Sequence, residues 1–348
     1  MTASRKTALL RLASSVAAVG LAFAIGAALM LAVGVDPLAV YARLAQGTLL
    51  NPYGLAQILF KATPLILAGL SVALAFKAGL FNIGAEGQMT MGGLCCALAA
   101  SELRGLPAVV HIPVCLLAAM LGGALWAAPP ALLKARRGAH EVITTIMMNF
   151  IAAALANYLV AVKFHEPETV HTAAGMPSSF LPRLDAFIGA FKGSPANVSL
   201  LIALTACAAV WWLLRKTAFG YEVRAAGLSP DAAATAGINV PARMAGAFVA
   251  AGALAGLGAA NFVMGYKHYF EEGFCGGAGF MGIAVALAGQ NNPAGIVAAA
   301  LLFGALSHGT LVINALVPKD IVLAIQALVI IFVIAFDGLA RRAEFSDD

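Results

Sequence analysis

The chain has 348 residues, of which 61% are hydrophobic and only 11% charged, and its formal net charge is +5. About a quarter of the residues of a soluble domain are charged, so the composition excludes a soluble protein and predicts one that lies in a lipid bilayer. The basic residues fall mostly at the ends of apolar runs and form no polybasic stripe, which excludes a nucleic-acid-binding face.

Apolar segments of about 20 residues, the length that crosses a bilayer as a helix, recur along the whole chain. The first follows a basic start but exceeds a secretory signal in length, so we expect an uncleaved span. The sequence predicts an all-α, polytopic membrane bundle of about ten transmembrane helices in one domain, residues 1–348. The eighth segment is short and the second and third nearly fuse, so eight or nine crossings are the alternatives. The predicted spans are residues 13–35, 54–76, 84–101, 109–133, 142–162, 198–214, 243–264, 277–290, 294–312 and 320–340.

The distribution of lysine and arginine predicts how the bundle is oriented. If the N-terminus is cytoplasmic, basic residues concentrate in the inside segments, as the positive-inside rule requires. Both termini are therefore predicted to be cytoplasmic. The inside residues include Arg5, Lys6, Arg11, Lys134, Arg136, Arg137, Arg215, Lys216, Arg341 and Arg342.

Residues 164–198 form a long segment that is predicted to be an extracytoplasmic loop. It is rich in proline and glycine, which suits a lid or a docking surface. Its His165, Glu166, Glu168 and His171 are interpreted as ordinary loop charges, because this spacing does not pair ligands on one helix face. The five cysteines show no C-x-x-C spacing and are interpreted as buried hydrophobic residues, so we predict no metal site.

Residues 215–243 are predicted to lie inside and contain the signals of a short helix. Ser229 suits the N-cap, Pro230 the first helical position, Asp231 the positive helix end and Gly237 the C-cap. The segment offers few large apolar side chains to a membrane surface. A cytoplasmic protein partner therefore explains it better, with Glu222 and Arg224 as further candidate contacts.

Two polar breaks interrupt the apolar pattern. In the first, glycines Gly79 and Gly84 flank Asn82, and Glu86 falls in the first turn of the helix that restarts, where the helix dipole favours an anion. The second break runs through Gln290, Asn291 and Asn292 to Pro293, so one helix should end before the proline and another begin there.

Glu86 poses the sharpest question, because a carboxylate at membrane depth costs about 2.5–3.5 kcal/mol. It should face protein or a wet path and not lipid. Whether Glu86 lines a substrate path or braces helices stays open, since polar residues within membranes are used in both roles. The candidates for either role are Asn82, Glu86, Gln88, Asn149, Asn157 and Gln326.

Signatures of catalysis are missing from the sequence. No G-x-x-x-x-G-K-[ST] motif occurs, so the chain binds no ATP through a P-loop of its own. The G-x-G-x-x-G match at residues 277–282 opens an apolar span without a preceding strand, so these glycines, like Gly252 and Gly256, are interpreted as close helix packing. The sequence therefore predicts no enzyme.

Four long blocks carry a family resemblance, in order and over nearly the whole chain. The sequence resembles the membrane permease subunits of bacterial nucleoside and simple-sugar ABC importers, whose wider family includes ribose and branched-chain amino acid permeases. The blocks are ATPLILAGLSVALAFKAGLFNIGAEGQ (62–88), GAHEVITTIMMNFIA (138–152), FGYEVRAAGLSPDAAATAGI (219–238) and GFMGIAVALAGQNNPAGIVAAALLFGAL (279–306).

The resemblance implies a multi-pass subunit of the bacterial cytoplasmic membrane that works with three partners. These are a second, related permease, a cytoplasmic ATPase with tandem nucleotide-binding domains that binds the ATP and Mg²⁺, and an extracytoplasmic substrate-binding lipoprotein. This chain itself then needs no cofactor. Residues 219–241 would be its coupling segment for the ATPase, with Glu222, Arg224, Ser229, Pro230 and Asp231 as the expected contacts.

Nucleosides, purine nucleosides first, are the expected substrates, and simple sugars or branched-chain amino acids are the alternatives within the family. An ion-coupled secondary transporter with Glu86 as the ion site is the alternative from another class. The helix predicted in residues 215–243 and the scarcity of intramembrane acids argue against it. A membrane subunit without any transport path is a further alternative.

Overall fold

The computed structural model describes residues 2–346, and these are mostly helical, with isolated β-bridges and without a strand. Side chains are described for residues 17–333, Lys319 excepted, and for 335–336. The basic residues near both ends that entered the orientation argument therefore have their side chains outside the described part. The chain divides into two compact units, Met1–Ile58 with Leu301–Asp348 and Leu59–Ala300.

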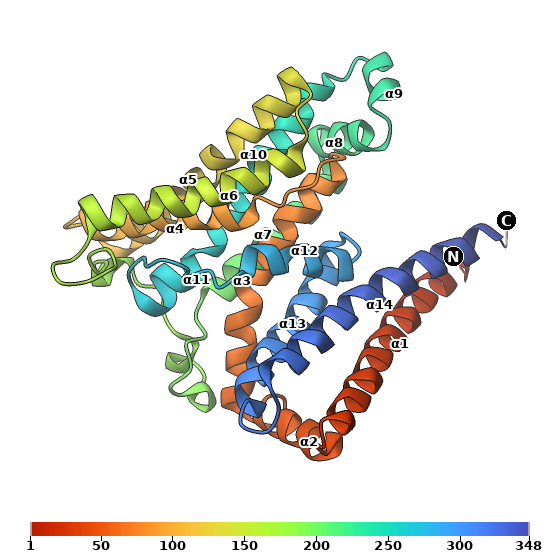
Figure 1. Ribbon diagram of the computed structural model, residues 1–348. Helices are drawn as coiled ribbons and strands as arrows, with labels where there is room; N and C mark the ends of the chain where they lie inside the picture. The colour runs from red at the N-terminus through yellow and green to blue at the C-terminus, as the bar shows by residue number, and fades with distance from the viewer. Residues whose placement is uncertain (1, 347–348) are drawn as a thin grey trace. The chain divides into compact units, whose positions relative to one another are not determined.

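The first unit pairs the two ends of the chain. Helix α1 (Thr2–Ala32) lies along α14 (Lys319–Ser346) (Figure 1). Between α1 and α3 (Pro52–Lys77) stands α2 (Pro37–Gly47), which the sequence analysis did not predict. Its local signal is Asp36-Pro37, because Asp36 accepts a hydrogen bond from the Leu38 N–H at 2.9 Å and Pro37 occupies the first turn. Tyr41 of α2 holds α1 by donating to the Phe23 carbonyl at 2.6 Å.

The second unit contains most of the helices. The elements α3 and α13 each contribute residues to both units. The elements between α3 and α14 lie in this unit, except for the part of α13 beyond Ala300. They are α4 (Ala85–Glu102), α5 (Ala108–Arg137), α6 (Glu141–Leu159) with the π-helical turn η1 (Val160–Phe164), the short turns η2 (Pro177–Ser179), η3 (Leu184–Ala186) and η4 (Gly189–Phe191), α7 (Ser199–Lys216), α8 (Ala218–Leu228), α9 (Pro230–Thr235), α10 (Val240–Gly258), α11 (Ala260–Phe262), η5 (Val263–Lys267), α12 (Ala278–Ala288) and α13 (Pro293–Ile313).

Glycines bring α4, α5 and α10 into direct backbone contact. A Cβ atom added at Gly92 of α4 would lie 2.5 Å from the Cα atom of Gly256 in α10, and one added at Gly256 would overlap the Ala119 carbonyl oxygen of α5. Small residues are the usual means of close helix packing in membranes. The predicted packing role of Gly252 and Gly256 is thus confirmed, since Gly252 lies equally close to Gly123 of α5.

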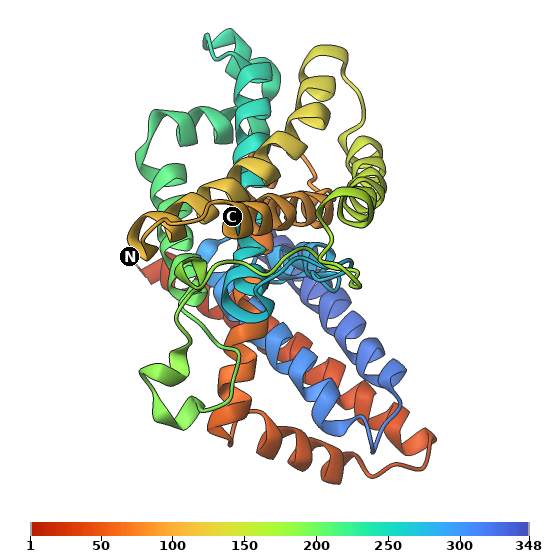
Figure 2. The ribbon, with the colours of Figure 1, turned by 90° about the vertical axis from the view of Figure 1, so that its left-hand side faces the viewer.

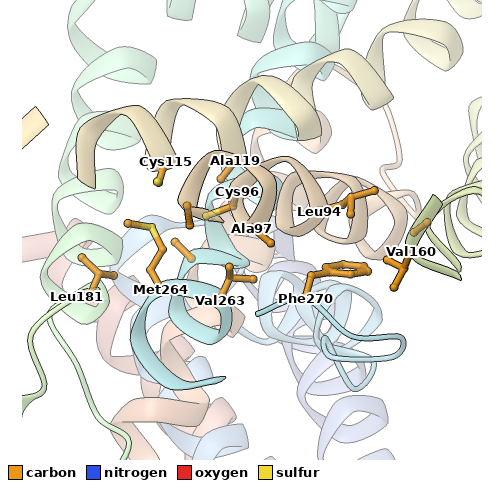
Figure 3. Packing of buried hydrophobic residues seen from close by; sticks show 13 residues of the cluster. Leu94, Cys96, Ala97, Cys115, Ala119, Val160, Leu181, Val263, Met264 and Phe270 are labelled. Carbon is orange, nitrogen blue, oxygen red and sulfur yellow. The ribbon is translucent and has the colours of Figure 1, made fainter. Parts of the chain in front are cut away.

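A buried apolar cluster continues from this contact toward the long loop between α6 and α7 (Figure 3). It joins residues of α4 and α5 with η1, the loop and η5. Its largest members, Phe270 and Met264, are 1% exposed. The loop contributes Leu181 to this cluster, so at Leu181 the loop packs against the helices. The labelled members are Leu94, Cys96, Ala97, Cys115, Ala119, Val160, Leu181, Val263, Met264 and Phe270.

The predicted helical class is confirmed, and each of the ten predicted spans falls on a helix. Among the residues that the structure describes, six helices are long and apolar enough to cross a membrane by length and composition: α3, α5, α6 with η1, α7, α10 with η5, and α13. Shorter apolar stretches lie in α1, α12 and α14. The most apolar part of α3 is 89% buried, so protein covers most of it. That of α7 is only 22% buried, so α7 presents an apolar surface suited to lipid or another subunit. Ten crossings and cytoplasmic termini remain predictions.

Candidate functional site

The first polar break separates α3, which ends at Lys77, from α4, which begins at Ala85. Asn82 and Gln88 are 0% and 1% exposed and face each other in a reciprocal amide pair, with N···O distances of 2.8 and 3.0 Å. Asn82 also donates to the Ser71 hydroxyl of α3 at 3.1 Å and accepts from the Gly84 N–H at 3.1 Å. The pair therefore ties the end of α3 to the start of α4, and both amides are occupied by protein partners.

Asn149 of α6 holds the same break from another side. Its amide nitrogen donates to the Ile83 carbonyl at 2.9 Å, and its amide oxygen accepts from the Gly87 N–H at 2.9 Å. These backbone groups lie where the helix restarts and would otherwise lack intrahelical partners. A polar side chain from α6 thus completes the hydrogen bonding of the interrupted helix.

Glu86 bonds to a helix that lies far away in the sequence. Its carboxylate oxygens accept hydrogen bonds from the Gly277 N–H at 3.1 Å and the Gly279 N–H at 2.7 Å, at the start of α12. The carboxylate also sits in the first turn of α4. It therefore meets the positive ends of two helices, an arrangement that stabilises an anion within a protein.

The glycines of the G-x-G-x-x-G match divide into two kinds. Gly279 packs against the backbone of Glu86, and Gly282 against Ala68 of α3, as the packing interpretation predicts. Gly277 differs, because no atom lies within 4 Å of an added Cβ and its φ of 81° is left-handed. It serves the backbone turn at the start of α12 rather than close packing.

The second break lies between α12, which ends at Ala288, and α13, which begins at Pro293. Gln290 and Asn291 both have positive φ, 55° and 52°, and the Asn291 N–H returns to the Ala286 carbonyl at 2.8 Å. Asn292 accepts from the Ala294 N–H at 3.3 Å and so starts α13. A sharp turn thus joins two helices at this break.

The remaining two path candidates are not brought to this network. Asn157 lies two residues before the C-terminal end of α6, far along the helix from Asn149. Gln326 is 6% exposed in α14, which belongs to the other unit. The described residues also line an apolar cavity of about 510 Å³, and none of the six path candidates borders it. It is lined by Leu74, Met120, Trp212, Leu213, Leu254 and Leu257, among others.

The predicted coupling segment folds as two short helices, α8 and α9, joined at Ser229. Ser229 is the N-cap of α9 and accepts from the Ala232 N–H at 3.4 Å; Pro230 and Asp231 occupy the first turn. Glu222 of α8 forms an ion pair with Arg243 at the start of α10. Arg224 donates to the Gly220 carbonyl of its own helix at 3.3 Å. Of the five expected contacts, Glu222 is therefore already occupied within the chain, while Ser229, Pro230 and Asp231 are exposed.

Sequence reasoning missed two apolar residues of α8. Tyr221 is 62% exposed and Leu228 is 88% exposed. They stand seven positions apart, so they share one face of the helix. An exposed tyrosine and leucine on one face are typical of a surface that another protein covers. In the sequence, the position of Tyr221 and Leu228 beside the charged residues of the coupling segment was the signal for a role in docking.

A second buried polar cluster also escaped the sequence analysis. Asn261 of α11, 1% exposed, accepts from the Ser199 hydroxyl at 2.8 Å and the Asn197 amide at 3.1 Å, and it donates to the Phe60 carbonyl of α3 at 3.2 Å. It therefore joins the start of α7 to α3. Single asparagines in long apolar segments give little warning of such a role.

The long loop of residues 164–198 packs against the segment that follows α11. Both ribbon views place the loop and this segment side by side (Figures 1 and 2). The Thr172 N–H donates to the Phe270 carbonyl at 3.0 Å and the Gly175 N–H to the His268 carbonyl at 2.7 Å. The His268 ring stacks on Phe180, with centroids 3.6 Å apart. The loop is thus fixed by backbone bonds and ring stacking over part of its length.

His268 predicts how acid affects this loop. Burial and the nearby positive charge of Arg183 lower the pKa of His268 below its ordinary value of 6.5. The unfolded chain therefore binds a proton more readily, so stability should fall as the pH drops below about 6.5. We expect a small decrease in melting temperature between about pH 7.5 and 5.5. His268→Asn, which tolerates the φ of 66°, should reduce this decrease. The control is His165→Asn in the exposed part of the loop, and equal pH slopes for the two variants would contradict the prediction.

Residues 54–334 match the family described as branched-chain amino acid transport system / permease component. The chain belongs to this permease family. Its members are transport components, so the permease is not an enzyme. The family and the apolar helices together make it a multi-pass membrane protein.

The permease is similar over most of its length to several ABC transporter permeases. It is 36% identical to the guanosine ABC transporter permease protein NupP of Bacillus subtilis, over 91% of both chains. It is 35% identical to the glucose ABC transporter permease protein TsgB13 of Haloferax volcanii, over 92% of this chain and 86% of the relative. It is 34% identical to the nucleoside ABC transporter permease protein NupB of Lactococcus lactis, over 89% and 87%.

The same two Nup systems contain a second permease that this one resembles less. NupQ of Bacillus subtilis is 29% identical over 81% of this chain, and NupC of Lactococcus lactis 27% over 72%. In each species the permease is therefore more similar to one Nup permease, NupP or NupB, than to the other, NupQ or NupC. No solved structure matches the permease.

Proposed function

We propose that this permease forms the translocation path of an ABC importer for nucleosides, with purine nucleosides as the first candidates. The observation that carries the proposal is the 36% identity to a guanosine permease over 91% of both chains. The glucose permease at 35% identity supports simple sugars as the alternative substrate class. A nucleoside carries a sugar ring, so both substrate classes present ring hydroxyls to the path.

The partners follow from the same family. The permease pairs with a second, related permease, as the two Nup subunit types in each species suggest. A cytoplasmic ATPase binds the ATP and Mg²⁺, and an extracytoplasmic lipoprotein delivers the substrate. The chain works as one transmembrane domain of the bacterial inner membrane, with about ten crossings and cytoplasmic termini.

Transport then requires that the ATPase act on this chain through α8 and α9. ATP binding closes the ATPase dimer, and the two short helices pass the movement to the membrane helices, which open alternately outward and inward. The polar network around the first break braces the helices, because Asn82, Gln88 and Asn149 already hold protein partners. The ion-coupled alternative needs Glu86 to exchange an ion, whereas its carboxylate is engaged by two N–H groups.

Uptake in cells tests the proposal. Radiolabelled purine and pyrimidine nucleosides are supplied to wild-type cells, to cells with this gene deleted and to cells with it restored, with glucose, ribose and leucine as competitors. We expect uptake to fall on deletion, to return on restoration, to need ATP and to survive an ionophore. Competition by glucose or ribose alone would assign the permease to sugars, and loss of uptake with the ionophore alone would support ion coupling.

The exposed face of α8 gives a prediction about the ATPase. Replacing Tyr221 and Leu228 by serine removes two apolar side chains that a partner would bury, and such anchors contribute about 1–2 kcal/mol each. We expect the ATPase to bind the purified permease at least about tenfold more weakly. Val170→Ser, equally exposed at 85% in the loop predicted outside, is the matched control. Unchanged ATPase affinity in the double variant would place the docking surface elsewhere.

A further inference from the structure

Helix α8 has two opposite faces. Tyr221 and Leu228 are exposed on one, whereas Val223 and Ala226 are 0% exposed on the other, which also carries Gly227. At 100° per residue the two sets lie on opposite sides of the helix axis. One face of α8 is therefore open to a partner while the other is held by the rest of the second unit.

The buried face reaches the first polar break, at the end of α3 (Figure 1). A Cβ atom added at Gly227 would overlap the Lys77 carbonyl oxygen and lie 2.8 Å from the Gly79 nitrogen. A Cβ atom added at Gly79 would lie 3.3 Å from the Gly227 Cα atom. The two backbones thus touch with no side chain between them, and packed backbone transmits a displacement without being compressed.

The segment that Gly227 touches is the one from which the polar network extends. Gly79 has a φ of 73° and turns the chain out of α3. Beyond it Asn82 pairs with Gln88, the Ile83 carbonyl binds Asn149 of α6, and Glu86 binds the start of α12. A shift of residues 77–79 would therefore move the attachment points of α4, α6 and α12 together.

We propose that the contact between Gly227 and Gly79 is where movement of the coupling segment enters the membrane helices. The proposal rests on the proposed function, in which a cytoplasmic ATPase docks on α8 and α9. It makes Gly227 and Gly79 positioning residues that touch neither substrate nor ATPase. It also gives the first break a mechanical role, because the break joins the contact to three helices.

Gly227→Ala tests the contact in the complete transporter, purified through a tag on this permease together with its copurifying subunits and reconstituted in lipid vesicles. The added methyl group would push α8 away from the break. We expect the ATPase to remain bound and basal ATP hydrolysis to stay within twofold of wild type, while uptake of labelled guanosine falls at least tenfold. Gly246→Ala is the matched control, since its added Cβ would lie 3.4 Å from the Phe219 ring, an ordinary contact.

The outcomes separate this proposal from the docking proposal. Wild-type uptake by Gly227→Ala would overturn it, as would loss of the bound ATPase, because Gly227 would then act on docking. If the Tyr221→Ser, Leu228→Ser variant keeps its ATPase, the docking surface is wrong while the Gly227 result still stands or falls by itself. If Gly227→Ala does not assemble, Val223→Ala decides, since it loosens the same buried face without a clash. It should lower uptake per bound ATPase several-fold, and unchanged uptake per bound ATPase would overturn the proposal.

Discussion

Replacing Glu86 by alanine is expected to destabilise the permease strongly, by roughly 3 kcal/mol or more. The change removes two hydrogen bonds to a charged acceptor, each of which contributes about 1.5–3 kcal/mol. It leaves the Gly277 and Gly279 N–H groups without that acceptor and two helix ends without their anion. The measurement is the melting temperature of the purified transporter together with uptake per assembled complex.

Glu86→Gln should have an intermediate effect. The amide keeps one oxygen acceptor, but its NH₂ group then faces an N–H donor at the start of α12. Glu102→Gln is the matched control, because Glu102 is the exposed acid at the other end of α4. If Glu86→Ala melts like wild type and yet abolishes uptake, Glu86 acts on the substrate path and the bracing role is wrong.

The positions of the helices could be predicted from the sequence because each is a local property. Apolar runs of about 20 residues give the spans, and the glycines and amides of residues 77–88 and 289–293 interrupt them. The start of α9 follows from Ser229 and Pro230 in the same way, whereas its C-cap is Ala236 and not the predicted Gly237. The unpredicted α2 also had a local signal in Asp36 and Pro37. It was too short and too weakly apolar to stand out beside the spans.

The partners of the polar residues could not be predicted, because they are set by tertiary packing. Glu86 binds the backbone 191 residues further along, and Asn149 binds Gly87 across 62 residues. Nothing at Glu86 itself distinguishes a helix cap from a water-filled path. Its two N–H partners favour the cap, and the Glu86→Ala measurement tests it. Arg243 likewise takes Glu222 out of the expected ATPase contacts. The candidate ATPase contacts Tyr221 and Leu228 are recognised by their exposed side chains and not by charge.

Gly256→Ala is expected to separate α10 from α5 and to destabilise the helical core by about 2–3 kcal/mol, the upper part of the range for overpacking. The added methyl group would overlap the Ala119 carbonyl oxygen, and backbone cannot move aside as a side chain can. Gly92 of α4 also packs against Gly256, so α4 would be displaced as well. The yield of monodisperse complex and its melting temperature report the effect.

Gly258→Ala on the same helix isolates the geometric cause. It adds the same methyl group and gains the same helix propensity, but its nearest neighbour, at 2.9 Å, is the terminal methyl group of Met89, which can rotate away. We therefore expect Gly258→Ala to assemble close to wild type. If both variants lose stability equally, glycine flexibility and not close backbone contact holds α4, α5 and α10 together. If neither does, the three helices can part slightly without loss, and the packing role given to Gly256 is wrong.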